Sequence, residues 1–195
     1  MKKNYLLLIF LTFMVASCTQ QNKKSAHETS DNTQTEEDAT PQARATSSYD
    51  KLMYSFDKEW QTKESDPKIY PPYYGGAYID DNNDLTIYVL GDPNQHRAAL
   101  TEIIGNEDFI LKTGNYSYKE MLEAMNSINQ FLGDVKVPES HIVVTNFAGA
   151  FPSVTDNRVV VEFVELNDAV IRAFKNDVID SPVVDFRQGE RPVMQ

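Results

Sequence analysis

Residues 73–91 read YYGGAYIDDNNDLTIYVLG, and the rest of the chain is organised around this stretch. Two apolar runs, 77–79 and 85–90, flank the polar segment 80–84. Val, Ile, Tyr and Thr favour a half-buried pleated strand, whereas Asp and Asn tolerate the backbone conformations of a tight turn. The stretch therefore predicts a β-hairpin.

The segments around the hairpin predict further helices and strands. Hydrophobic residues at helical spacing indicate a first helix, in which Trp60 packs on the body of the domain; a ligand platform is the alternative role for this side chain. Asp92, Ser117 and Asn167 are capping residues that predict the starts of three more helices. The predicted helices cover residues 49–63, 93–104, 118–132 and 168–178, and the predicted strands cover 77–79, 85–90, 108–112, 141–154, 158–165 and 182–186. We expect the tail, 187–195, to fray.

The sequence also contains a candidate internal repeat. Sliding the chain by 74 residues places Asn83 on Asn157 and aligns the apolar positions of two strand–turn–strand–helix–strand segments. A chance alignment of two amphipathic segments is the alternative. In both cases the pattern predicts an α+β fold, with helices packed on a mainly antiparallel sheet and two ββαβ units as the candidate arrangement.

The N-terminus carries the pattern of an export signal. Lys2 and Lys3 form a positive region, and the apolar run that follows, 5–15, is too short to span a bilayer as a helix. The small residues that precede Cys18 resemble the lipobox of bacterial lipoproteins, which implies cleavage before Cys18 and lipidation of its thiol and amino group. An ordinary signal peptide with an incidental cysteine is the alternative. Acyl chains such as palmitate contribute about 0.8 kcal/mol per buried methylene, so two or three of them would anchor the chain to the cell envelope, outside the cytoplasm.

The composition divides the chain into three predicted segments. Residues 1–17 form the signal peptide, and 18–48 comprise the lipidated cysteine and a disordered tether, because this polar segment has little apolar surface to bury. Residues 49–195 form the α+β domain, whose core is supported by a hydrophobic content of 41% for the whole chain. The tether has an expected reach of about 30 Å.

Charge and cysteine content exclude several classes of function. The formal net charge is −11, and removal of residues 1–17 deletes two lysines and leaves −13. This acidity disfavours nucleic acids as partners. Cys18 is the single cysteine, so the lipidated chain would have no disulfide, thiolate metal site or cysteine nucleophile.

The sequence contains no catalytic motif, and we expect neither enzymatic activity nor a cofactor. The three histidines, His27, His96 and His141, belong to no HExxH or comparable pattern, and no serine lies in a nucleophile elbow. The acidic segment 80–84 has oxygen ligands for calcium but is followed by neither the glycine nor the glutamate of an EF-hand loop. A turn is therefore the prediction there, and a weak cation site is the alternative.

Four tyrosines form the candidate binding surface: Tyr70, Tyr73, Tyr74 and Tyr78. Tyrosine combines a large apolar ring with a polar tip, which suits it to interfaces. The alternative is that these rings pack against the N-terminal helix.

Three motifs together resemble a known family. The strand GGAYID, the strand LTIYVLGD and the later segment TDNRVVVEFVE before a helix are similar to the pro-segment of streptogrisin and α-lytic-type secreted serine proteases, over about residues 70–186. In that family the pro-segment helps its protease to fold and then inhibits it, with a tail lying in the active site. No protease follows before Gln195, so the resemblance implies action in trans.

The sequence leaves two functions to compare. The first is a lipid-anchored binding module that presents its domain to a protein or a glycan of the envelope. The alternative is a trans-acting inhibitor or folding partner of a secreted serine protease.

Overall fold

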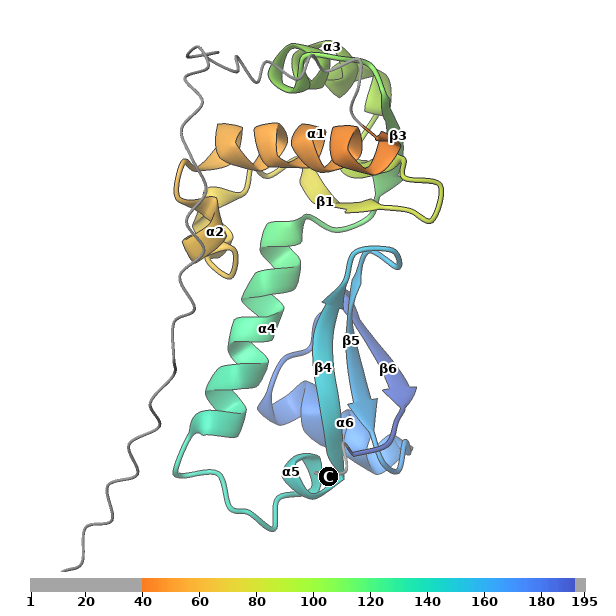
Figure 1. Cartoon of the computed structure of the whole chain (residues 1–195). Coiled ribbons are helices and arrows are strands. Elements are labelled where there is room, and N and C mark those ends of the chain that lie inside the picture. Colours follow the sequence, from red (N-terminus) through yellow and green to blue (C-terminus); the bar gives the residue numbers. More distant parts are fainter. Residues whose placement is uncertain (1–39, 192–195) are drawn as a thin grey trace, which may run out of the picture. The chain divides into compact units, whose positions relative to one another are not determined.

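The computed structural model describes residues 40–191, which lie within one compact unit, Gln34–Gln195. These residues form six α-helices and two three-stranded sheets, with helices packed on the sheets (Figure 1), so the predicted α+β class is confirmed. Cys18, the signal segment 1–17 and most of the predicted tether lie outside the described residues, as does His27. None of the described helices is long and apolar enough to cross a bilayer.

The N-terminal subdomain is residues 41–114. Its elements are α1 (Pro41–Phe56), α2 (Trp60–Lys63), the 3-10 helix η2 (Pro67–Ile69), β1 (Tyr74–Ile79), β2 (Leu85–Leu90), α3 (Pro93–Ile104) and β3 (Phe109–Gly114). β1 and β2 form the predicted antiparallel hairpin. β3 lies on the other side of β2 and runs parallel to it.

The C-terminal subdomain is residues 118–188. Its elements are α4 (Tyr118–Gly133), α5 (Ile142–Asn146), β4 (Phe147–Ser153), β5 (Arg158–Phe163), α6 (Asp168–Asp177) and β6 (Val184–Gln188). β4 and β5 are antiparallel, and β6 is parallel to β5. Each subdomain thus has a long helix, a short helix and a ββαβ unit, in the same order.

The internal repeat is confirmed down to the strand register. Both first strands slip register next to a glycine, between Tyr74 and Gly76 in β1 and between Phe147 and Gly149 in β4. The two hairpin turns place their asparagines in the left-handed region, with φ of 66° at Asn83 and 50° at Asn157.

Only half of the strand pairing is antiparallel, so the expectation of a mainly antiparallel sheet needs correction. The third strand of each sheet follows a helix, α3 or α6, that crosses over the sheet. Such a crossover returns the chain in the same direction, which makes the pairing parallel.

The first helix starts eight residues before the predicted boundary at 49, and residues 41–48 are helical rather than part of a tether. Thr40 caps this helix with its side chain, and Pro41 occupies the first helical position, where a missing N–H costs nothing. The polar composition of the segment concealed one apolar contact, because Ala45 is buried in the core.

One predicted strand, 141–154, is helical in its first part. The segment Ile142–Asn146, expected to be a strand, is the short helix α5, because His141 caps it by accepting a hydrogen bond from the N–H of Val143. The strand begins only at Phe147. The predicted capping residues Asp92, Ser117 and Asn167 all cap helices as expected.

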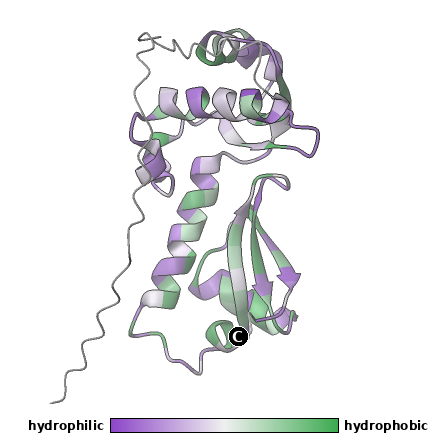
Figure 2. Ribbon diagram, viewed as in Figure 1, coloured by the Kyte–Doolittle hydropathy of each residue, from purple (hydrophilic) through white to green (hydrophobic). Residues whose placement is uncertain are grey.

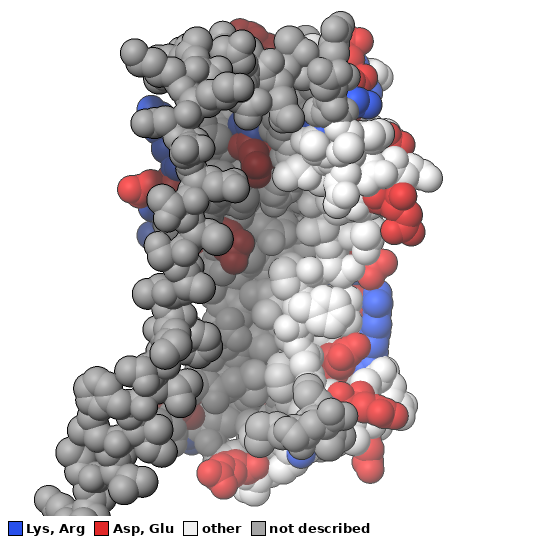
Figure 3. Space-filling view, in the orientation of Figure 1, with Lys and Arg blue, Asp and Glu red and all other residues white. Residues whose placement is uncertain are grey.

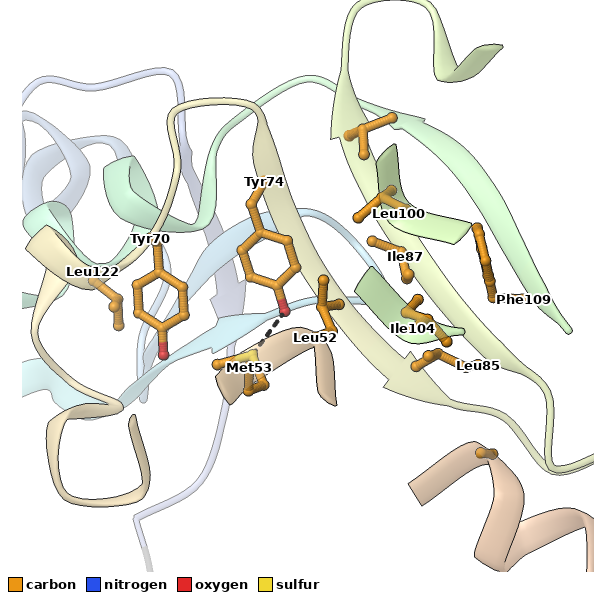
Figure 4. Packing of buried hydrophobic residues seen from close by; sticks show 12 residues of the cluster. Leu52, Met53, Tyr70, Tyr74, Leu85, Ile87, Leu100, Ile104, Phe109 and Leu122 are labelled. Atoms are coloured by element: carbon orange, nitrogen blue, oxygen red, sulfur yellow. Dashed lines mark hydrogen bonds between the residues drawn. The ribbon is translucent and has the colours of Figure 1, made fainter. Parts of the chain in front are cut away.

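Each sheet has its own hydrophobic core. The N-terminal core packs α1 and α3 on one sheet face, with Leu52, Leu85 and Ile87 fully buried (Figure 4). In Figure 2 the strands are largely hydrophobic, while the loop between β1 and β2 is hydrophilic. Tyr118, at the start of α4, packs against both cores and links them.

Candidate functional site

The junction between the two subdomains is built around the side chain of Asn157. Its Nδ2 donates to the carbonyl oxygens of Gly75 at 3.0 Å and Tyr116 at 2.8 Å. Its Oδ1 accepts from the N–H groups of Asn115 at 2.6 Å and Tyr116 at 2.8 Å. Asn157 is 3% exposed, so these four bonds satisfy a buried amide and fix the β4–β5 turn against the N-terminal subdomain.

Glycines make this close approach possible. A Cβ on Gly75 would lie 3.3 Å from Nδ2 of Asn157, and one on Gly114 would lie 3.1 Å from Oδ1. Gly76 has φ of 109° and would place a Cβ 2.8 Å from Val154. The glycine pair of the first hairpin is therefore the surface that receives the second hairpin. Tyr88 adds a hydrogen bond from its hydroxyl to the Thr155 carbonyl.

The structure separates the four tyrosines predicted to form a binding surface. Tyr70 and Tyr74 are core residues, with 4% and 2% of their surface exposed, and their rings stack at 5.7 Å. These two cannot contact a partner, which corrects the prediction. They are buried because α1 extends over them, with Phe56 5.0 Å from the Tyr74 ring.

Tyr73 and Tyr78 are half-buried and lie in different surroundings. Tyr73 stacks on His96 with a centroid distance of 4.7 Å. Tyr78 accepts a hydrogen bond from Lys112 and stacks with Tyr88 on the open face of the N-terminal sheet. The four tyrosines therefore do not form one surface.

Burial changes the ionisation of the packed tyrosines. It raises the pKa of Tyr49 to about 12, and burial likewise raises the pKa of Tyr70 and Tyr74. The cause is desolvation, because a phenolate in the apolar core would lack the water that stabilises its charge.

The two described histidines have structural partners. The Nε2 of His96 lies 3.2 Å from the Leu90 carbonyl oxygen. The Nδ1 of His141 accepts from Val143 as a helix cap, and its Nε2 lies 3.3 Å from Asp177 at the end of α6. These contacts hold α5 against α6.

The acidic segment between β1 and β2 forms the predicted turn. Asp80 Oδ1 accepts from the N–H groups of Asn82 at 2.9 Å and Asp84 at 3.0 Å. Within residues 40–191, no three His, Cys, Asp or Glu side chains are arranged to hold a metal ion.

Two features of the C-terminal subdomain suit it to bind another polypeptide. Within the described residues, β4 is an edge strand, and its Phe151 is 44% exposed. Edge strands present unpaired backbone groups that a strand of another chain can use. The second feature is the C-terminal tail, which lies next to the beginning of this edge.

The tail is bound rather than frayed up to residue 191. Residues 187 and 188 belong to β6, and the N–H of Gly189 donates to the Phe163 carbonyl. Arg191 donates to the carbonyls of Thr145 and Phe147, at the end of α5 and the start of β4. A guanidinium at a helix C-terminus is favourable because the carbonyls there lack helical partners. Residues 192–195 lie outside the described part of the chain.

Sequence reasoning missed the exposed ring on the β4 edge, the anchoring of the tail by Arg191 and the role of Asn157. The sequence did mark Asn157 as a turn residue equivalent to Asn83, but nothing local distinguishes a buried turn from an exposed one. Arg191 gave no signal, because its partners are backbone carbonyls 44 and 46 residues away in the chain.

In Figure 3 acidic side chains are spread over the viewed face, in keeping with the net charge of −11.

The fold and these surfaces define a class: an α+β protein of two repeated subdomains with an accessible strand edge beside its C-terminal tail. Comparison with protein-family models makes this more specific. Residues 21–114 match the model of a Pro-like N-terminal domain, and residues 119–189 match that of a Pro-like C-terminal domain. The boundary between the matches coincides with the end of β3 and the start of α4. No curated protein matches the sequence significantly.

Proposed function

We propose that this chain is a lipid-anchored, non-enzymatic binding protein that acts as a pro-segment-like partner, an inhibitor or folding partner in trans, of a secreted serine protease. The observation that carries the proposal is the pair of Pro-like matches, one on each subdomain and in order along the chain. The pro-segment resemblance of the hairpin motifs agrees with it.

The binding surface in this proposal is the edge of β4 together with the C-terminal tail. The edge offers backbone hydrogen bonds, and Phe151 offers an exposed ring beside them. Arg191 holds the described end of the chain at the start of β4. A partner that pairs with β4 would therefore meet the tail as well.

The test is an inhibition and refolding assay with secreted serine proteases of the streptogrisin and α-lytic type. We expect stoichiometric inhibition of the native protease by the mature chain, or a higher yield when the denatured protease is refolded in its presence. Deletion of residues 192–195 leaves every described contact in place, and we expect it to weaken inhibition. No effect on any such protease, in either assay, would refute the proposal.

A matched pair of substitutions locates the surface. Phe151→Ala removes the exposed ring beside the edge, whereas Val135→Ala removes a side chain that is 98% exposed in the loop after α4. We expect only the first to weaken binding. Equal effects would mean that the partner does not bind at β4.

The anchor is tested separately. Labelled palmitate should be incorporated into the wild-type chain in a bacterial host, and Cys18→Ser should abolish both labelling and membrane association. Labelling that persists in this variant would refute lipidation at Cys18.

A further inference from the structure

A shallow trough runs along the outer face of α1, on the other subdomain from the β4 edge. Where α1 ends and α2 begins, a groove of about 370 Å³ is lined by Asp50, Lys51, Tyr54, Lys58, Trp60 and Gln61. A second groove of about 540 Å³ shares Asp50 and Lys51 and continues to Thr40 at the helix start. The lining residues recur every three or four positions, so they form one stripe of the helix.

The trough contains two aromatic side chains, Tyr54 and Trp60, that are not fully buried. Tyr54 is 55% exposed, and within residues 40–191 it makes no hydrogen bond or ring contact. Trp60 is half-buried, and its indole is held edge-on against Tyr49, with centroids 5.8 Å apart and planes at 82°. Trp60 also packs against the N-terminal core, so the exposed Tyr54 ring lies on the same groove as an indole that the core holds in place.

Three polar groups of the trough are available to a ligand. Among the described residues, the Trp60 indole N–H, the Gln61 amide and the Lys58 ammonium have no hydrogen-bond or ionic partner. The part of the trough nearer Thr40 adds hydroxyl groups from Thr46 and Ser47. A fixed indole, an exposed ring and several polar groups along one groove resemble the usual composition of a small-ligand site.

We propose that this trough binds an acidic oligosaccharide. The apolar faces of sugar rings would pack on Tyr54 and Trp60, and their hydroxyls would bond to Asp50 and Gln61. Lys58 would pair with the carboxylate of a uronic or similar acidic sugar. The open ends of the trough suit a polymer. The walls present no strand edge or deep apolar pocket of the kind that holds peptides.

The single tryptophan of the chain makes the proposal directly measurable. Because Trp60 is the only tryptophan, tryptophan fluorescence, excited where tyrosine does not absorb, reports on the surroundings of a single residue that lines this trough. The full mature chain is titrated with an oligogalacturonate, with a malto-oligosaccharide of equal length as the neutral probe and oligoglutamate as the acidic peptide probe. We expect a saturable change with the oligogalacturonate, a much weaker one with the neutral sugar, and none with the peptide.

Two substitutions at exposed positions test the assigned roles. Tyr54→Ala should weaken binding about 3- to 10-fold, as expected for one stacking partner. Lys58→Gln should weaken it and reduce its dependence on salt. The matched controls are Phe151→Ala and Lys136→Gln, an exposed ring and an exposed lysine of the C-terminal subdomain, which should leave the affinity unchanged.

Three results would overturn the proposal: no saturable change with the oligogalacturonate, equal binding of the neutral sugar or the peptide, or wild-type affinity in Tyr54→Ala. Thermal melts of the two variants check that the fold is intact. This proposal can fail independently of the proposed protease binding. The Tyr54→Ala variant should inhibit a protease as the wild type does, and the Phe151→Ala variant should bind the sugar as the wild type does.

Discussion

The two subdomains share one backbone plan but fill it with different side chains. The N-terminal core uses tyrosine rings, with Tyr70 and Tyr74 stacked under α1. The C-terminal core uses phenylalanine, with Phe174 packed edge-on against Phe163 and Phe186 at 6.0 and 5.2 Å. The comparison shows that the strand register and the bulge depend on the apolar pattern and the glycines, while the polarity of the core remains free to vary.

The two hairpin turns show a second difference. Asn83 and Asn157 occupy equivalent left-handed positions, but Asn83 is only partly buried and Asn157 is almost fully enclosed. The same turn thus serves as a solvent-facing loop in one subdomain and as the joint with its neighbour in the other. Each prediction below changes one subdomain and uses its equivalent as the control.

The largest expected difference between the two subdomains is in their stability at alkaline pH. The folded-state pKa of Tyr49, about 12, lies above its ordinary value, and burial raises the pKa of Tyr70 and Tyr74 too. The stability that these neutral tyrosines contribute is full below about pH 10, the ordinary pKa, and is lost as the pH rises through the raised folded values. We therefore expect the N-terminal subdomain to unfold first. Trp60 fluorescence and amide resonances of the C-terminal core measure this.

The control replaces one hydroxyl. Tyr74→Phe removes an ionisable group but keeps the ring, so the alkaline midpoint of the N-terminal subdomain should move to higher pH. If both subdomains of the wild type unfold at the same pH, and Tyr74→Phe does not change that pH, tyrosine ionisation does not drive the transition.

The next effect compares the two turn asparagines. Asn157→Ala removes the four hydrogen bonds of a buried amide and leaves the N–H groups of Asn115 and Tyr116 without this acceptor, so it should lower the free energy of unfolding by about 3–5 kcal/mol. Asn83→Ala should cost about 1 kcal/mol, the strain of alanine in the left-handed region. Both variants carry that strain. The difference between their free energies of unfolding, measured by urea denaturation, therefore gives the contribution of the junction hydrogen bonds. A difference below about 1 kcal/mol would mean that the junction contributes little.

A smaller effect is expected at the two bulge glycines. Gly76→Ala combines positive φ with a Cβ 2.8 Å from Val154, and we expect a loss of about 2 kcal/mol. At Gly149 the nearest atom would be Glu162 Oε2 at 3.6 Å, an ordinary contact, so Gly149→Ala should stay within about 0.5 kcal/mol. Thermal denaturation compares the two. Val154→Ala combined with Gly76→Ala should recover only part of the loss, because the φ strain remains.

The sequence predicted those features that depend on local chemistry. Capping residues located three helices, and turn residues with alternating apolar strands located both hairpins and the repeat. What it could not predict depends on distant contacts: the burial of Tyr70 under α1, the parallel third strands and the four bonds of Asn157. The early start of α1 was missed because Ala45 and Ser48, both buried, are small side chains that form no visible apolar stripe among their polar neighbours.

The smallest effect concerns the charged contacts on the open faces of the sheets. Hydrogen bonds from Arg187 and Ser153 lower the pKa of Asp156 in the folded chain. The stability that ionised Asp156 contributes is therefore present above about pH 4, its ordinary pKa, and is lost as the pH falls through its lower folded-state pKa. Arg187→Ala should lower the free energy of unfolding only slightly at pH 7, because the pair is exposed, and hardly at all at pH 2. The equivalent contact in the N-terminal sheet is a hydrogen bond from Lys112 to the Tyr78 hydroxyl, and Asp80 adds only the smallest electrostatic contribution there, so the cost of Lys112→Ala should change less between these pH values. Denaturation at both pH values measures each cost, and a cost for Arg187→Ala that persists at pH 2 would assign its role to packing rather than to Asp156.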